Sequence, residues 1–345
     1  MKTTDRRRFL QLSGALGVAG ALPGLVAGRA SAAETLTGVS YLPPSYKALS
    51  YGSQGFVDRL TAAAPDGVTI DYFDSAKLLK ADEQLPALRS GTIDFMFHTT
   101  SYITRSLPIL GITGLPGVVE ALYEHPERIA RGTPLFELIN EKLAEDDLLM
   151  LSMGGGLLEP EYLWSTEKAP IRSIDDIDGK KVRVVSFEAT GVMESFGAAA
   201  VRIPSSELYL AMQRGTVDAA VANISTIIGR SIQEQTSTLY ELPITAFGIG
   251  VFVSTRRWER MDDAVKDAML EAAEWFDADS AKQANTVIYP DEYRPMLEKQ
   301  GVEVVPASAA DETRLAGAAK PVIEAWKKEV GEETGTRAID LALGN

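Results

Sequence analysis

The chain has 345 residues, of which 45% are hydrophobic and 24% charged, a balance typical of a globular protein long enough for two domains. Its formal net charge of −14 argues against binding to nucleic acid or to an anionic membrane surface. With no cysteine and two histidines, the sequence excludes disulfides, thiolate metal sites and histidine-rich metal sites. We therefore expect no metal and no other cofactor.

Residues 1–32 have the features of an export signal. Residues 6–10 read Arg-Arg-Arg-Phe-Leu, an apolar stretch rich in glycine and alanine follows, and residues 30–32 form a small-x-small cleavage site. Paired arginines followed by Phe-Leu are typical of twin-arginine (Tat) translocation. The alternative, a transmembrane anchor, needs about 20 strongly apolar residues, and this stretch is shorter and contains Pro23. We expect a signal peptide and a periplasmic protein that is not embedded in the membrane.

Beyond this segment, short β-rich runs alternate with amphipathic helical stretches. In the first half, the pattern predicts strands at 36–42, 68–73, 93–98 and 148–153 and helices at 47–64 and 82–89. In the second half it predicts strands at 181–185, 200–203 and 216–223 and helices at 189–196 and 206–214. This alternation predicts α/β layers with a largely parallel sheet, in which ligands bind at the carboxyl ends of the strands.

Residues 83–94 and 207–218 form an internal repeat. Both read Glu, then Leu or Met five residues later, then Gly-Thr, a β-branched residue and Asp. In each, a helix ends at a glycine that can adopt the left-handed conformation, and a strand follows. The repeat favours two lobes of similar plan, although such connectors are also common without lobe symmetry.

The end of the chain is strongly helical. A run over 262–297 precedes a strand at 301–306 and an amphipathic helix at 311–330. The long run is either a spine across both lobes or an ordinary packing helix, and its periodicity does not decide between them.

No catalytic motif is found: the sequence lacks G-x-S-x-G, H-E-x-x-H, a P-loop and G-x-G-x-x-G. Residues 154–156 are three glycines that either cradle a phosphate or, as we favour, form a crossing between domains. We therefore do not expect an enzyme.

Arg183 is the most informative residue. It lies in a predicted strand among the apolar residues Val182, Val184 and Val185. A buried guanidinium needs a partner, and its planar fork fits a carboxylate in a bidentate pair. That carboxylate belongs either to a ligand or to an Asp or Glu of the chain, and the residues alone leave both open.

The surrounding motifs resemble a known family. Residues 173–184 (SIDDIDGKKVRV), 197–200 (GAAA) and 204–218 (PSSELYLAMQRGTVD) are similar to the core motif of the substrate-binding subunits of tripartite ATP-independent periplasmic (TRAP) transporters, the DctP-type family. Residues 75–94, 108–116, 252–257, 301–304 and 324–326 also fit, so the resemblance covers nearly all of the chain after the signal.

The resemblance implies a type II periplasmic-binding-protein fold, with two lobes joined by a hinge and a long helix bridging both. We place lobe I at 33–158 and 249–288, and lobe II at 159–248 and 289–345. It also implies that Arg183 grips a ligand carboxylate and that Asn223, at the end of a strand, contacts the ligand. A second arginine common in the family is absent; Tyr162-Leu163-Trp164 stand there, so Tyr162 and Trp164 are expected to meet the ligand's far end.

The first lobe is expected to contribute residues that follow its strands. These candidates are His98, Thr99, Tyr41, Tyr46 and Lys47. His98 is equally well explained as a structural histidine, and exposed tyrosine and lysine are common on any protein surface.

The resulting hypothesis is an extracytoplasmic solute-binding protein. It captures a small organic acid anion, with a monocarboxylate favoured over a dicarboxylate, and delivers it to TRAP transporter membrane subunits. The alternatives are a periplasmic cofactor-dependent enzyme exported in its folded state, and a binding module that feeds a sensory receptor.

Overall fold

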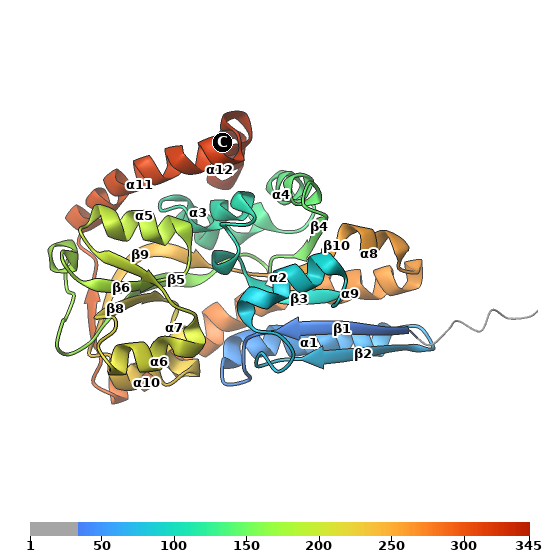
Figure 1. Ribbon diagram of the computed structural model, residues 1–345, viewed down its shortest axis with the longest axis horizontal. Helices are drawn as coiled ribbons and strands as arrows, with labels where there is room; N and C mark the ends of the chain where they lie inside the picture. The colour runs from blue at the N-terminus through green and yellow to red at the C-terminus, as the bar shows by residue number, and fades with distance from the viewer. Residues whose placement is uncertain (1–33) are drawn as a thin grey trace, which may run out of the picture. The chain divides into compact units, whose positions relative to one another are not determined.

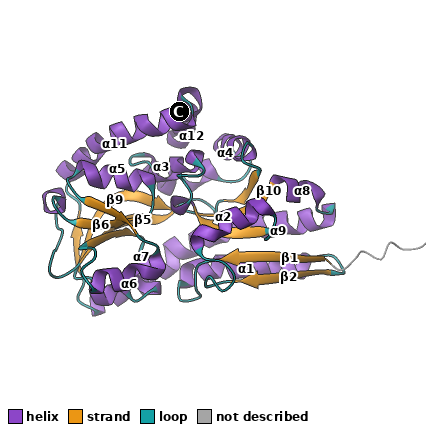
Figure 2. Cartoon of the chain, viewed as in Figure 1, coloured by secondary structure: helices purple, strands orange, loops and turns teal. Residues whose placement is uncertain are grey.

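Two mixed β-sheets, each flanked by helices, organise the chain (Figures 1 and 2). The computed structural model describes residues 34–345, so the predicted signal peptide lies outside the described residues. We call the five-stranded sheet and its helices lobe I, and the six-stranded sheet and its helices lobe II. Residues 33–345 form one compact unit, and the lobe boundaries given above stay predictions.

The sheet of lobe I has the strand order β2-β1-β3-β10-β4. β1 pairs in parallel with β2 and β3, whereas β10 is antiparallel to β3 and β4. The strands are β1 (Glu34–Ser40), β2 (Val68–Phe73), β3 (Phe95–Thr99), β4 (Leu148–Ser152) and β10 (Ile249–Ser254). The helices α1 (Lys47–Ala63) and α2 (Ala81–Ser90) connect the parallel strands.

The sheet of lobe II has the order β11-β9-β5-β8-β6-β7. β6 is parallel to β7 and β8, β11 is parallel to β9, and β5 is antiparallel to both β8 and β9. The strands are β5 (Leu158–Ser165), β6 (Lys181–Val184), β7 (Ala199–Arg202), β8 (Ala219–Ala222), β9 (Thr238–Phe247) and β11 (Glu303–Pro306).

The expectation of largely parallel sheets is only partly right. The parallel strands β1 to β3 and β6 to β8 are joined by helices, as predicted, but β5 and β10 run antiparallel to their neighbours. The reason is the chain path: β4 continues into β5, and β9 into β10, so each pair of strands passes from one sheet to the other. A strand that enters a sheet from the other lobe runs against the strands that begin inside it.

The three glycines at 154–156 form the crossing from β4 to β5. All three have positive φ, and the backbone N–H of Gly155 donates to Oδ1 of Asp277 (3.0 Å). The same carboxylate oxygen accepts from the Ser152 hydroxyl (2.6 Å) and the Met153 N–H (3.1 Å). An internal carboxylate therefore occupies the donors that a phosphate would need, which agrees with the crossing role favoured from sequence.

The predicted helical run near the end of the chain is continuous. It consists of α9 (Asp263–Gln283), a π-helical stretch η6 (Ala284–Tyr293) and α10 (Arg294–Lys299). α9 packs along α1 of lobe I, while Arg294 forms ion pairs with Glu159 of β5 and Glu241 of β9 in lobe II. In Figure 1 the run, coloured orange, extends from one sheet to the other. The helical run therefore extends across both lobes, as the first of the two alternatives predicts.

The C-terminal helices α11 (Ala309–Val330) and α12 (Glu332–Leu343) also join the lobes. α11 packs on α5 of lobe II, and the indole N–H of Trp326 donates to the Pro108 carbonyl (2.6 Å) in the segment after β3. The remaining elements are η1 (Thr100–Tyr102), η2 (Pro108–Gly114), α3 (Val118–Glu124), η3 (Pro126–Ile129), α4 (Pro134–Ala144), η4 (Ile174–Ile177), α5 (Phe187–Ser195), α6 (Ser205–Gln213), α7 (Ile224–Gly229), η5 (Ile232–Gln235) and α8 (Thr255–Arg260).

Candidate functional site

A cavity of about 550 Å³ lies between the two lobes. Lobe I contributes Tyr41 after β1 and Tyr102 after β3, and lobe II contributes Arg202 and Ser205 around the end of β7 and Arg230 after α7. Most of these residues follow the carboxyl ends of parallel strands, where α/β proteins bind ligands. The geometry therefore agrees with the position expected from sequence.

Three arginines at or beside this cavity have no acidic partner. Arg183, Arg202 and Arg230 form no ion pair with any carboxylate of residues 34–345. The arginines that do so are Arg89, Arg172, Arg256, Arg257, Arg294 and Arg314. In a chain with 48 acidic residues, three unpaired guanidinium groups in one cleft are an arrangement suited to a bound anion.

Arg183 lies behind the cavity wall and is 1% exposed. Its Nε donates to the Ile203 carbonyl (2.9 Å) and its Nη1 to the Val221 carbonyl (2.8 Å). Its Nη2 lies 3.4 Å from the Tyr102 hydroxyl. The guanidinium is thus held by neutral acceptors, and it forms no ion pair with an acid of residues 34–345.

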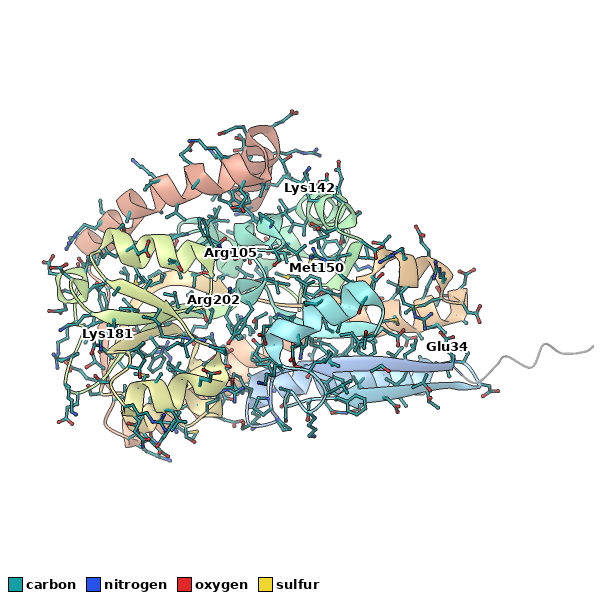
Figure 3. All side chains as sticks on the ribbon, viewed as in Figure 1. Glu34, Arg105, Lys142, Met150, Lys181 and Arg202 are labelled. Atoms are coloured by element: carbon teal, nitrogen blue, oxygen red, sulfur yellow. The ribbon has the colours of Figure 1, made fainter. Side chains whose placement is uncertain are left out.

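Tyr102 of lobe I contacts two of the three arginines, Arg183 and Arg202. Its hydroxyl accepts from the Ser205 N–H (2.8 Å), and its carbonyl accepts from Nη2 of Arg202 (2.9 Å). Figure 3 labels Arg202, which reaches from the strand β7 of lobe II toward the segment that carries Tyr102. Tyr102 therefore contacts Arg183, Arg202 and Ser205 of lobe II from lobe I.

Tyr41, Thr99 and His98 form a buried group beneath the cavity. The Tyr41 and Thr99 hydroxyls are hydrogen-bonded (2.6 Å), and the His98 ring packs 5.1 Å from the Tyr41 ring. Both nitrogens of His98 lie 2.9 Å from backbone carbonyls, those of Thr99 and Ala81. Burial lowers the pKa of the imidazole. Of these residues, Tyr41 lines the cavity, while Thr99 and His98 support it.

Tyr46 and Lys47 are placed differently from each other. Tyr46 is fully buried, and its hydroxyl accepts from Nε of Arg230 (3.0 Å), so it orients a cavity residue. Lys47 instead forms an ion pair with Glu292 of the bridging run (2.5 Å). The structure does not bring Lys47 to the cavity that holds the arginines, because an acid of the chain binds its ammonium group.

Asn223, Tyr162 and Trp164 are also engaged within the protein. The Asn223 side chain caps α7 by accepting from the Ser225 N–H (2.8 Å), and it donates to the Glu159 carbonyl (2.5 Å). Trp164 is buried, and its indole N–H donates to the Ala222 carbonyl (2.8 Å). Tyr162 is half-buried beside Glu159. None of the three lines the cavity that holds the arginines.

Sequence reasoning missed Arg202, Arg230, Tyr102 and Glu161. Arg202 carries the same signal as Arg183, because it lies within the strand predicted at 200–203. Tyr102 lies three residues beyond the predicted contact Thr99, and Glu161 precedes the predicted contact Tyr162. Arg230 follows a short helix, and no local pattern would have identified it.

Glu161 is a carboxyl group in the interior between the lobes. Burial raises its pKa to about 8, although the positive charge of Arg183 and the backbone N–H of Asn223 oppose that rise. Within residues 34–345 no group of three or more acidic or histidine side chains is arranged to hold a metal ion. No helix of the same residues is long and apolar enough to cross a membrane.

Comparison with known proteins gives one family. The family described as bacterial extracellular solute-binding protein, family 7 (DctP), matches residues 44–329. A solute-binding protein of Chromohalobacter salexigens is 24% identical over 290 residues, which cover 82% of each chain. One of Albidiferax ferrireducens is 25% identical over 194 residues, which are 54% of this chain and 53% of that relative.

Solved structures of similar fold come from several bacteria. An extracytoplasmic solute receptor of Bordetella pertussis that binds pyroglutamic acid has a TM-score of 0.78 at 18% identity, over 90% of this chain and 99% of that one. A TRAP solute-binding protein of Sulfitobacter with bound β-D-galacturonate has a TM-score of 0.78 at 19% identity, over 90% and 100%. One from Sulfurospirillum deleyianum with bound succinate has a TM-score of 0.76 at 19% identity, over 89% and 99%.

Proposed function

Because the chain belongs to the DctP family of bacterial extracellular solute-binding proteins, we propose that it captures a small organic acid anion for a TRAP transporter. The anion binds between the lobes, and the closed protein then delivers it to the transporter's membrane subunits. We further propose that residues 1–32 direct export to the periplasm by the Tat pathway. The observation that carries the proposal is the set of arginines without acidic partners around the cleft.

Arg183 is the proposed grip for the ligand carboxylate. It is buried, it is oriented by two backbone carbonyls, and one side of its fork faces only a long contact with Tyr102. A small shift of Tyr102 exposes this side to a carboxylate oxygen, which makes a shorter and charge-assisted bond. Arg202 and Arg230 line the cavity in front of it and supply the positive field that attracts the anion.

A monocarboxylate is the favoured ligand class. The segment where the family often carries a second arginine holds Glu161, Tyr162 and Trp164, none of which supplies a positive charge to bind a second carboxylate. Among the structural neighbours, the receptor from Bordetella pertussis binds pyroglutamic acid, which has a single carboxyl group. Sugar acids such as the galacturonate of the Sulfitobacter protein also carry one.

Capture proceeds by closure of the hinge. The crossing strands and the bridging run α9–η6–α10 connect the lobes, and the contacts of Tyr102, Tyr46 and Ser45 across the cleft hold them together. A carboxylate held by Arg183 of lobe II places the far end of the ligand against lobe I, and contacts made with both lobes favour the closed form. Closure then removes water from the ion pair and strengthens it.

A thermal-shift screen of organic acids tests this function. A ligand that binds only the folded protein raises the melting temperature, by an amount that grows with its concentration relative to Kd. We expect carboxylates to do so and neutral analogues, such as the corresponding amides, to have no effect. If no organic acid shifts the melting temperature while a neutral solute or a metal ion does, the proposal is wrong.

A further inference from the structure

Two buried polar groups on neighbouring strands of lobe II lack hydrogen-bond partners. Glu161 of β5 and Thr245 of β9 are partners in the sheet register, and they are 1% and 0% exposed. Neither Oε2 of Glu161 nor Oγ1 of Thr245 has a partner within residues 34–345. An unsatisfied buried polar atom is costly, so two of them on directly paired residues indicate that something from outside completes their bonds.

The surroundings place these atoms beside the proposed carboxylate grip. Glu161 is close enough to Arg183 for the guanidinium charge to act on its carboxyl, yet the two form no ion pair. The backbone N–H of Asn223, at the start of α7, also acts on the same carboxyl. The Glu161 carboxyl and the Arg183 guanidinium are therefore near one another but leave each other unpaired.

A second buried carboxyl comes to the same region from α5. Glu188 is 2% exposed, and its Oε2 accepts from the Thr104 hydroxyl (3.2 Å). Gly114 lies between it and Thr245: a Cβ atom on Gly114 would be 2.9 Å from Oγ1 of Thr245 and 3.7 Å from Oε2 of Glu188. Glu188 and Thr245 thus both lie close to Gly114.

From this juxtaposition we infer that Glu161 and Thr245 form a second ligand subsite, which accepts an N–H group. The ligand is then an organic acid whose carboxylate binds Arg183 and whose ammonium or lactam N–H donates to Glu161. The inference rests on the proposed function and narrows the class of ligand to amino acids, imino acids and lactam acids. Burial of the Glu161 carboxyl supports it, since a buried acceptor gains most from a donor that arrives with its own charge or dipole.

Other classes of acid fit this arrangement less well. A dicarboxylate brings its second negative charge to Glu161, which offers no positive charge to bind it. An acid whose remaining atoms are hydrocarbon leaves Oε2 of Glu161 and Oγ1 of Thr245 unsatisfied in the closed state. Only a ligand with a hydrogen-bond donor beside its carboxylate can bind Arg183 and also donate to the paired residues Glu161 and Thr245.

Matched pairs of acids that differ by one N–H test the inference. One pair is pyroglutamate and 3-oxocyclopentanecarboxylate, in which a CH₂ group replaces the ring N–H. The other is L-proline and cyclopentanecarboxylate, and succinate serves as a dicarboxylate. Calorimetry on the purified exported protein should show at least a tenfold preference for the N–H member of a pair.

Variants then assign the preference to Glu161. Glu161→Leu should remove the preference for the N–H member of each pair. Glu161→Gln should weaken the binding of L-proline at least tenfold more than the binding of pyroglutamate, because glutamine keeps an acceptor but no charge. Glu167→Gln, at an exposed position just past the end of β5, is the matched control and should leave the preference unchanged. The melting temperature of each unliganded variant shows whether it folds.

The outcomes distinguish failure of the N–H subsite from failure of the proposed carboxylate capture. The subsite is wrong if both members of each pair bind equally, or if the preference survives in Glu161→Leu. It is also wrong if succinate or another carboxylate binds and none of the N–H acids does. In each of these cases the proposed capture of carboxylates still stands. If no carboxylate binds at all, both are wrong.

Discussion

The hydroxyl of Tyr102 in lobe I accepts a 2.8 Å hydrogen bond from the backbone N–H of Ser205 in lobe II. The same hydroxyl lies 3.4 Å from Nη2 of Arg183. One oxygen therefore contacts both the first turn of α6 and the proposed carboxylate grip. We therefore propose that a ligand at Arg183 influences closure through Tyr102.

Tyr102→Phe is expected to weaken ligand binding by about three- to tenfold, because one net hydrogen bond contributes about 1 kcal/mol. The closed state is also less favoured, which small-angle scattering detects as a larger radius of gyration at subsaturating ligand. Tyr209→Phe is the control, since its hydroxyl bonds Glu234 on the surface of lobe II. Equal affinity of the Tyr102 variant and the wild type would remove Tyr102 from the mechanism.

Arg183→Ala should cost at least about 2 kcal/mol in ligand affinity, because it deletes a charge-assisted bond to the carboxylate. It also lowers the melting temperature, since the carbonyls of Ile203 and Val221 lose their donor. Calorimetry separates the two effects when it is run well below the variant's melting temperature. Arg172→Ala, which breaks an exposed ion pair with Glu303, should leave affinity unchanged. Unchanged binding by a folded Arg183 variant would refute the assignment.

Lys47→Ala should leave ligand affinity within about twofold of wild type, because the ammonium group binds Glu292 and not the cavity that holds the arginines. The pair is solvent-exposed, so its loss should change the free energy of unfolding by less than about 1 kcal/mol. Titration calorimetry and chemical denaturation measure the two quantities. A large loss of affinity would return Lys47 to the binding site, where the sequence first placed it.

The unliganded protein should lose a stabilising contribution from Glu161 as the pH rises. The folded-state pKa of Glu161 is about 8, above the ordinary value of 4.5, so the folded state binds this proton more tightly than the unfolded state. The contribution is complete below pH 4.5 and is lost as the pH approaches 8. The melting temperature of the wild type should therefore fall relative to that of Glu161→Gln across this window. If the melting temperatures of the two proteins change equally with pH, Glu161 does not titrate in this way.

Gly155→Ala should be far more destabilising than Gly91→Ala. Both glycines have positive φ, which costs a residue with a side chain roughly 1–2 kcal/mol. At Gly91 a Cβ atom meets nothing within 4 Å, whereas at Gly155 it would lie 1.9 Å from the Asp277 carbonyl oxygen. Urea denaturation should show an additional loss of at least about 2 kcal/mol for the Gly155 variant, in the range of overpacked sites. Equal losses would mean that the crossing shifts to accommodate a side chain.

The sequence predicted most helices and strands because their signals are local. The strand at 68–73 is confirmed at the same residues, and the helix begun at Lys47 ends one residue earlier than expected. The strand predicted at 216–223 is shorter, since the N–H groups of Thr216 and Val217 bond back to the Ala211 carbonyl in the turn after α6. Helix ends and turns of this kind depend on backbone geometry more than on residue type.

The side-chain partners of the candidate site were harder to predict. β5 shifts register on both sides of Glu161, so alternation along the strand could not show which of Glu161 and Tyr162 points inward. The ion pair between Lys47 and Glu292 joins residues 245 positions apart, and Arg230 meets Tyr46 over 184 positions. Such pairs are set by how the lobes pack, which one sequence without homologues does not reveal.

The two carbonyls that hold Arg183 also affect how fast and how tightly an anion can be bound. A free arginine side chain loses rotational freedom worth about 2 kcal/mol when it is fixed. Here the carbonyls of Ile203 and Val221 hold the guanidinium in the folded protein, so a carboxylate that binds as proposed meets a cation already oriented. Such preorganisation leaves more of the interaction free energy for affinity, as rigid receptors generally achieve.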